Sequence, residues 1–120
     1  HFGEIGRWID FFLDGVIATA EESIHLCKKI TKLRDEDMAK IQALARRESE
    51  SGIVVLRKLY SRPIVTTRIV MDWTRFTRAG AQRVIDRFTA MGILSPRQAK
   101  GSYDRSYIYR RYIDIFMKEN

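Results

Sequence analysis

The sequence has a single cysteine, Cys27, and no apolar run near the roughly 18–20 residues that a membrane-spanning helix needs. A lone cysteine excludes an internal disulfide and a cysteine-based metal cluster, and it suits a reducing compartment. We interpret Cys27 as a small apolar residue on a helix face. These absences predict a soluble, cytoplasmic protein that does not associate with membranes.

Catalytic motifs are also lacking. The sequence has no glycine-rich phosphate loop, no Gly-x-Ser-x-Gly run and no pair of histidines with an acid on one helix face. His25 stands one turn after Glu21 and Glu22, a spacing that suits a metal ligand or a general base, but no second histidine or cysteine lies near it. We expect no catalytic, cofactor or metal site in these residues.

The chain begins at His1 without an initiator methionine, a basic segment or the apolar core of a signal peptide, so we expect a fragment of a longer protein. Its 120 residues, of which 45% are hydrophobic, suffice for a buried core.

Positive charge is concentrated in the second half of the chain. Residues 1–60 contain as many acidic as basic side chains, so the net charge of +7 comes entirely from residues 61–120, where most basic residues are arginine. Clustered arginines form bidentate contacts with phosphate and release counterions, which favours a polyanion as partner. A basic surface that serves only solubility is the alternative.

The first half has the periodicity of a helical hairpin. Apolar residues recur at helical spacing from Ile5 to Leu33, and Gly15 within this helix indicates close packing of a neighbouring element. A second helix is expected over residues 35–47, folded back on the first, with the acidic residues 35–37 in its first turn. The apolar arc of the first helix is unusually wide, so we expect another copy of the chain or an upstream domain to cover it. The residues expected at a dimer interface are Trp8, Phe11, Phe12, Leu13 and Val16.

Residues 51–120 have shorter apolar segments separated by turn and capping residues, an order typical of a winged helix-turn-helix. A helix must end before Pro63, and Thr77 is a good N-cap for a later helix that ends at about Met91, with Gly92 just beyond it. The expected order is a helix before residue 61, a short strand at 64–66, a helix at 67–73, a turn at 73–75, a helix from 77 to 91, strands at 93–98 and 103–109 around a turn at 99–102, and a helix at 110–117. The fold class is therefore mainly α with a small β-hairpin: a helical hairpin (1–50) followed by a winged helix-turn-helix (51–120).

The helix that starts at Thr77 would present its first turns to the major groove of double-stranded DNA, and Thr77 itself is expected to contact the nucleic acid. Arg78, Gln82 and Arg83 are expected on its outward side, where arginine suits guanine and glutamine suits adenine. Gly80 departs from this scheme because it lowers helix propensity. Residues expected to contact backbone phosphates are Arg75, Arg87, Arg97, Lys100 and Arg105.

Protein contact is the alternative to nucleic-acid contact, since many winged helices bind proteins or are purely structural. Tyr103, Tyr107 and Tyr109 alternate as strand residues do, which favours packing against the helices over base stacking.

Two runs resemble the Fic family. Residues 8–16 read Trp-Ile-Asp-Phe-Phe-Leu-Asp-Gly-Val, similar to the helix that follows the catalytic core of Fic proteins. Residues 107–115 read Tyr-Ile-Tyr-Arg-Arg-Tyr-Ile-Asp-Ile, similar to the end of the winged helix found at the carboxy terminus of such proteins. The family's catalytic signature, His-x-Phe-x-x-Gly-Asn-Gly-Arg, is absent, and His1-Phe2-Gly3 does not continue into it.

The resemblance implies a parent protein that transfers AMP from ATP to a hydroxyl of a target protein. ATP and a divalent metal would belong to the parent's missing core, so this fragment is expected to be non-enzymatic, a DNA-binding or regulatory appendage that also dimerises and contacts the Fic core. The alternatives are a protein-interaction and dimerisation module without nucleic-acid binding, and a free-standing transcription regulator.

Overall fold

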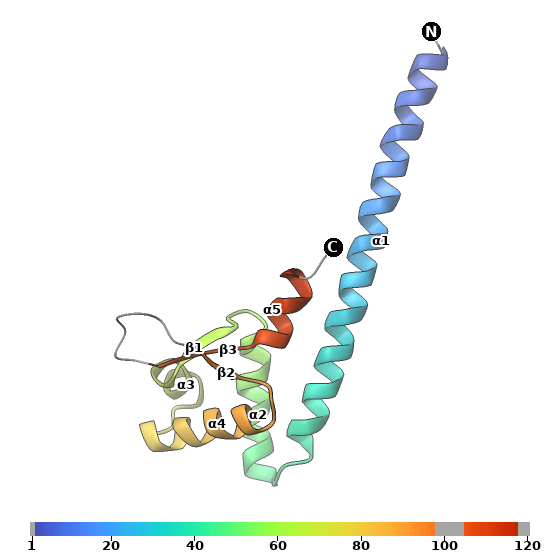
Figure 1. Ribbon diagram of the computed structural model, residues 1–120. Helices are drawn as coiled ribbons and strands as arrows, with labels where there is room; N and C mark the ends of the chain where they lie inside the picture. Colours follow the sequence, from blue (N-terminus) through green and yellow to red (C-terminus); the bar gives the residue numbers. More distant parts are fainter. Residues whose placement is uncertain (1, 98–104, 118–120) are drawn as a thin grey trace.

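The computed structural model describes residues 2–97 and 105–117. Within them the chain is mainly helical with a small antiparallel sheet, which confirms the predicted fold class of a helical hairpin followed by a winged helix-turn-helix (Figure 1). The elements are α1 (Phe2–Gln42), α2 (Arg46–Leu59), β1 (Ile64–Thr66), α3 (Thr67–Thr74), α4 (Arg78–Ala90), β2 (Ser95–Arg97), β3 (Ser106–Ile108) and α5 (Arg110–Met117).

Helix α1 is longer than the periodicity predicted. The expected break near residue 34 is absent, so the predicted separate helix over residues 35–47 is wrong, and the hairpin instead turns between Gln42 and Arg46. Leu33, Asp37 and Ile41 lie one helical turn apart on the same face and are all buried, which keeps the helix continuous through this region. The expected boundary after residue 50 falls inside α2.

The second half of α1 belongs to the winged-helix core, whereas its first half projects away from the domain (Figure 1). The molecule is accordingly elongated, measuring 71 × 37 × 23 Å. None of the helices in the described residues has both the length and the hydropathy to cross a membrane.

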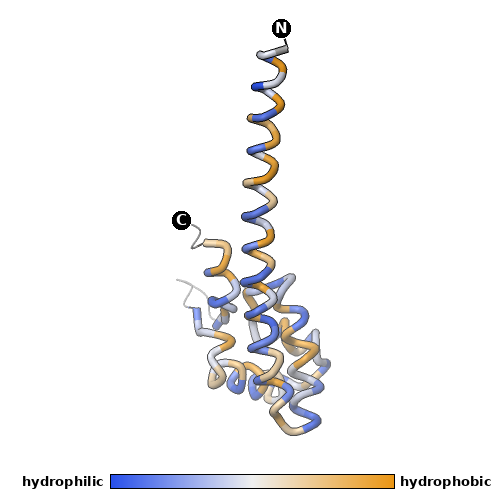
Figure 2. The backbone as a smooth tube through the Cα atoms, turned by 90° about the vertical axis from the view of Figure 1, so that its right-hand side faces the viewer, coloured by the Kyte–Doolittle hydropathy of each residue, from blue (hydrophilic) through white to orange (hydrophobic). Residues whose placement is uncertain are grey.

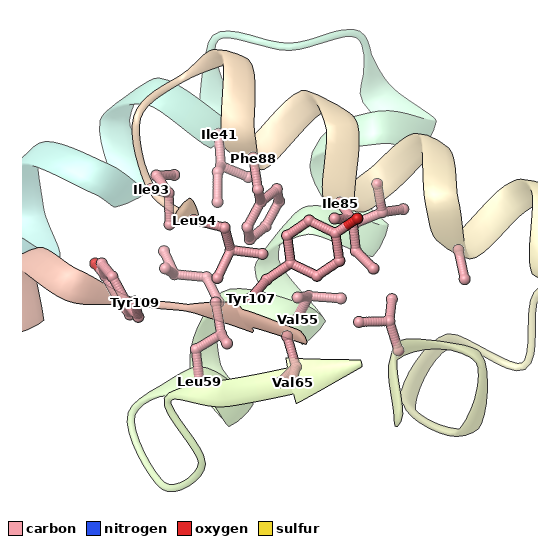
Figure 3. Packing of buried hydrophobic residues seen from close by; sticks show 14 of the residues in the cluster. Ile41, Val55, Leu59, Val65, Ile85, Phe88, Ile93, Leu94, Tyr107 and Tyr109 are labelled. Atoms are coloured by element: carbon pink, nitrogen blue, oxygen red, sulfur yellow. The ribbon is translucent and has the colours of Figure 1, made fainter. Parts of the chain in front are cut away.

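The sheet joins the start of the winged helix to its end. Strand β3 lies between β1 and β2 and is antiparallel to both, so that Tyr107 is opposite Val65 on one side and Pro96 on the other. Helices α2, α3 and α4 pack around this sheet, and Phe88 and Leu94 lie in the core between them and α1 (Figure 3). Strand β1 has its predicted range, whereas β2 starts later than predicted and β3 ends earlier, although Ile93 and Leu94 are buried just before β2.

Local sequence signals fix the helix-turn-helix. Thr77 is the predicted N-cap of α4, and its Oγ1 accepts a hydrogen bond from the Gly80 N–H at 3.2 Å. Gly92 follows the helix with a φ of +78°, as expected for its position. Packing explains why a glycine occupies position 80 within this helix, since a Cβ there would lie 3.1 Å from the Phe76 Cβ.

A buried carboxylate attaches α1 to the carboxy-terminal segment. Asp37 is fully buried, and it accepts hydrogen bonds from the Tyr109 hydroxyl and, at 2.9 Å, from the Arg111 Nη1. Arg111 also donates to Glu36 at 2.8 Å, and Lys40 lies 3.4 Å from Asp37. Burial, together with the hydrogen bond to Asp37, raises the pKa of Tyr109, so its phenol stays protonated and can donate. We call this group the Asp37 clamp.

Candidate nucleic-acid interface

A polar cleft opens where the starts of α3 and α4 meet strand β3. Figure 1 shows these elements on the side of the domain away from α1. The cleft has a volume of about 280 Å³. Its lining residues, which we call the arginine cleft, are Thr66, Thr67, Arg68, Arg78, Gln82, Arg105 and Tyr107.

The floor of the arginine cleft is organised by Gln82. Its Oε1 accepts a hydrogen bond from the Thr67 hydroxyl at 2.9 Å, and its Nε2 donates to the Asp86 Oδ1 at 2.9 Å and to the Tyr107 hydroxyl at 3.3 Å. Because a carboxylate can only accept, Asp86 fixes which end of the amide faces it. Gln82 is half-buried and its amide is hydrogen-bonded at both ends, so this side chain connects α3, α4 and β3 at the cleft.

Three arginines from three elements surround this floor. Arg68 lies in the first turn of α3, Arg78 is the first residue of α4, and Arg105 precedes β3. All three are exposed, and none of them forms a salt bridge with an acidic residue among those the structure describes. Among the residues that the structure describes, no acidic side chain lines the cleft, so its described lining is positively charged.

The exposed face of α4 carries small side chains together with charges of both signs. Arg83 is exposed on it together with Ala79, Asp86 and Ala90. Small alanines allow close approach of a partner, while Arg83 is the residue on this face that can donate to a base edge. Asp86 lies next to Arg83 on the same face but is hydrogen-bonded to Gln82.

The other residues predicted to contact DNA are distributed around this region. Arg75 is exposed in the turn before α4, and Arg97 is exposed on β2. Thr77 is occupied as the cap of α4. Arg87 forms a salt bridge with Glu48 of α2 at 3.1 Å and is only 26% exposed, because the end of α4 packs against α2. Lys100 lies outside the described residues.

The wing tyrosines are mainly packing residues. Tyr107 is 7% exposed and Tyr109 is fully buried, which confirms for these two the expectation of packing over stacking. Tyr103 lies outside the described residues.

Two residues that organise the fold and the cleft were not identified from sequence. Arg68 gave no signal beyond its basic charge, although its position just after the Thr66 cap could have placed it at a helix start. Asp37 was interpreted as part of a charged first turn, and only its partners 72 and 74 positions away reveal its role.

A second surface is the apolar face of α1. It is lined by Trp8, Phe11, Phe12, Gly15, Val16, Thr19 and Ala20, and the large side chains among them are 49–80% exposed. Leu13 is 48% exposed beside it. The rings of Trp8 and Phe12 stack with centroids 5.6 Å apart. Figure 2 shows apolar residues recurring along this projecting part of the helix.

The packing expected at Gly15 is not found within the described residues, since nothing lies within 4 Å of a Cβ built there. Cys27, expected on a helix face, is exposed on α1.

No protein-family model matches the sequence, and no curated protein matches it. Among solved structures, the chain is similar to Stf76 from the Sulfolobus islandicus plasmid-virus pSSVx. The identity is 19%, the match covers 50% of this chain and 80% of that chain, and the TM-score is 0.43. A likeness at this level indicates neither a family nor a function.

Proposed function

We propose that the winged helix binds double-stranded nucleic acid, with α4 in the major groove and the arginine cleft and wing against the backbone. The observation that carries this proposal is the convergence of Arg68, Arg78 and Arg105 on one cleft that, within the described part of the chain, has no acidic lining residue. Backbone phosphates supply most of the affinity in such complexes, and base edges supply the specificity.

The roles of individual residues differ. Arg83, exposed on α4, is the proposed base reader, because arginine forms bidentate contacts with guanine in the major groove. Arg75 and Arg97 are proposed to contact phosphates at the edges of the interface. Gln82 is proposed as a positioning residue, since its amide is already hydrogen-bonded.

We also propose that this chain is the non-catalytic carboxy-terminal part of a cytoplasmic Fic-type AMP-transferase. Two sequence runs in the family's order support this origin, and the first of them lies on the exposed apolar face of α1, where a catalytic core could pack. ATP and a divalent metal would then act in that core and not here.

Charge reversal at Arg78 and Arg83 should strongly weaken nucleic-acid binding. The wild-type protein is expected to bind a fluorescently labelled duplex with a log–log salt slope of about −3 or steeper, because several counterions are released. Fluorescence anisotropy across a salt series should show at least roughly tenfold weaker binding for Arg78→Glu/Arg83→Glu, since each lost charged contact contributes about 1.5–3 kcal/mol. Glutamate at the start of α4 suits the helix dipole, so this variant should fold.

The matched control is Arg7→Glu/Lys28→Glu, which makes the same change in net charge at exposed positions of α1. It should retain most of the affinity. A flat wild-type response at low salt, or equal losses in both variants, would contradict a site on α4.

The second candidate function is protein contact through the apolar face of α1. Its exposed aromatic residues favour a partner surface, which we propose to be the parent's catalytic core in the longer protein and a second copy in the isolated chain. This function is independent of the arginines.

Self-association should therefore depend on α1. Sedimentation velocity over a range of protein concentrations is expected to show dimers of the wild-type chain and mainly monomers of Trp8→Ser/Phe12→Ser, because two large apolar anchors are lost. Asp10→Ser/Asp14→Ser changes the same stretch of helix off the apolar stripe and should still dimerise. A wild-type chain that stays monomeric throughout would exclude the homodimer.

A further inference from the structure

We propose that the arginine cleft binds a single phosphoryl group, held as a phosphate ester by Arg68, Arg78 and Arg105. This deepens the proposed function and rests on it for one point, the source of the phosphate, which would be the backbone of a nucleic acid. The binding chemistry itself follows from the cleft.

The three arginines provide the donors that a phosphate requires. Each guanidinium carries five N–H groups in a planar fork that matches phosphate oxygens bidentately. They approach from α3, α4 and the segment before β3, so they surround the cleft instead of forming one solvated row on a single helix. A merely solubilising surface does not require such convergence.

The floor of the cleft adds neutral donors. The Tyr107 hydroxyl accepts a hydrogen bond from Gln82, which leaves its own hydrogen available to a ligand oxygen in the cleft. Tyr107 is 7% exposed, so strand β3 holds this hydroxyl in place. Thr67 begins α3, and the start of a helix favours an anion.

The size and charge of the cleft limit what can bind. A volume of about 280 Å³ lies just below the range of roughly 300–1,000 Å³ for small-molecule sites, which suits one phosphoryl group better than a whole nucleotide. The three arginines in the lining disfavour cations. Asp86, which contacts the Gln82 amide, does not line the cleft.

An NMR titration with inorganic phosphate tests the proposal directly. The side-chain amide signals of Gln82 report on the cleft floor, and chloride at matched ionic strength corrects for general screening. We expect saturable shifts of these signals with phosphate and not with chloride. In Arg68→Gln/Arg105→Gln the affinity for phosphate should fall about tenfold or more, because two charge-assisted donors are lost. Arg7→Gln/Lys28→Gln removes the same charge at exposed positions of α1 that do not line the cleft, and it should bind phosphate as the wild type does.

A second titration with duplex DNA identifies the source of the phosphate. If phosphate and DNA both bind, and both weaken in Arg68→Gln/Arg105→Gln, the proposal holds in full. If phosphate binds and DNA does not, the cleft serves a small phosphorylated molecule, and it is the nucleic-acid function that fails. If DNA binds but the Gln82 signals ignore phosphate and Arg68→Gln/Arg105→Gln binds DNA normally, the cleft proposal is overturned while the nucleic-acid function stands.

Discussion

Replacing Asp37 with alanine is expected to lower the free energy of unfolding by about 3 kcal/mol. The carboxylate is fully buried and accepts from Tyr109 and Arg111, so its removal leaves the Tyr109 hydroxyl without its partner inside the protein. The Arg111 side chain is 42% exposed and retains its salt bridge with Glu36, so the loss of its bond to Asp37 should cost little stability. Urea unfolding followed by circular dichroism measures this difference.

Glu36→Ala is the matched control, since it removes the neighbouring carboxylate on the same helix. The Glu36 side chain is 43% exposed, and the loss of its bond to Arg111 should lower stability by less than about 1 kcal/mol. If the two alanine variants unfold alike, the Asp37 clamp does not stabilise the attachment of α1 to the end of the chain.

Two helical glycines should respond in opposite directions to alanine. A Cβ at Gly52 would lie 2.8 Å from the Ile41 Cγ2 and 3.6 Å from the Phe88 Cε1, both in the buried core. Overpacking there should exceed the gain of about 1 kcal/mol in helix propensity, so Gly52→Ala is expected to lower stability by about 1–2 kcal/mol.

Gly15 is the control because no atom lies within 4 Å of a Cβ there among the described residues. Gly15→Ala should raise the helicity of α1 and leave the melting temperature unchanged or higher. Thermal unfolding by circular dichroism compares the two variants. A stabilised Gly52→Ala would mean that α1 and α2 separate easily enough to accommodate a methyl group.

The sequence predictions were accurate where the structure depends on interactions between residues close in sequence, and they failed where it depends on distant ones. Caps and turns of the winged helix act over a few residues, so Thr77, Gly92 and the limits of α3, α4 and α5 were predicted closely. The break expected at residue 34 was wrong because the acidic residues there satisfied a local rule about helix dipoles. One of these acidic residues, Asp37, instead accepts a hydrogen bond from Tyr109, which lies more than seventy positions away in the sequence.

In the candidate site, too, the features that depend on local sequence were predicted and those that depend on distant neighbours were not. Basic charge in the second half of the chain was evident from composition, and Arg78 and Arg83 were placed by periodicity. Whether an arginine faces solvent, a carboxylate or a cleft depends on neighbours that are distant in sequence. Arg87 is paired with Glu48 of another helix, whereas Arg68 joins Arg78 and Arg105 only because α3 packs beside α4 and β3.

Periodicity, caps and turn residues were sufficient to predict the helix-turn-helix, the order of the strands and the apolar stripe of α1, because these signals act locally. Contacts between distant parts of the chain explain why α1 continues to Gln42, why Asp37 is buried and why the Gln82 amide connects α3, α4 and β3 beside three arginines. These features depend on which surfaces pack together, and burial of a polar group is favourable only where distant residues supply its hydrogen-bond partners.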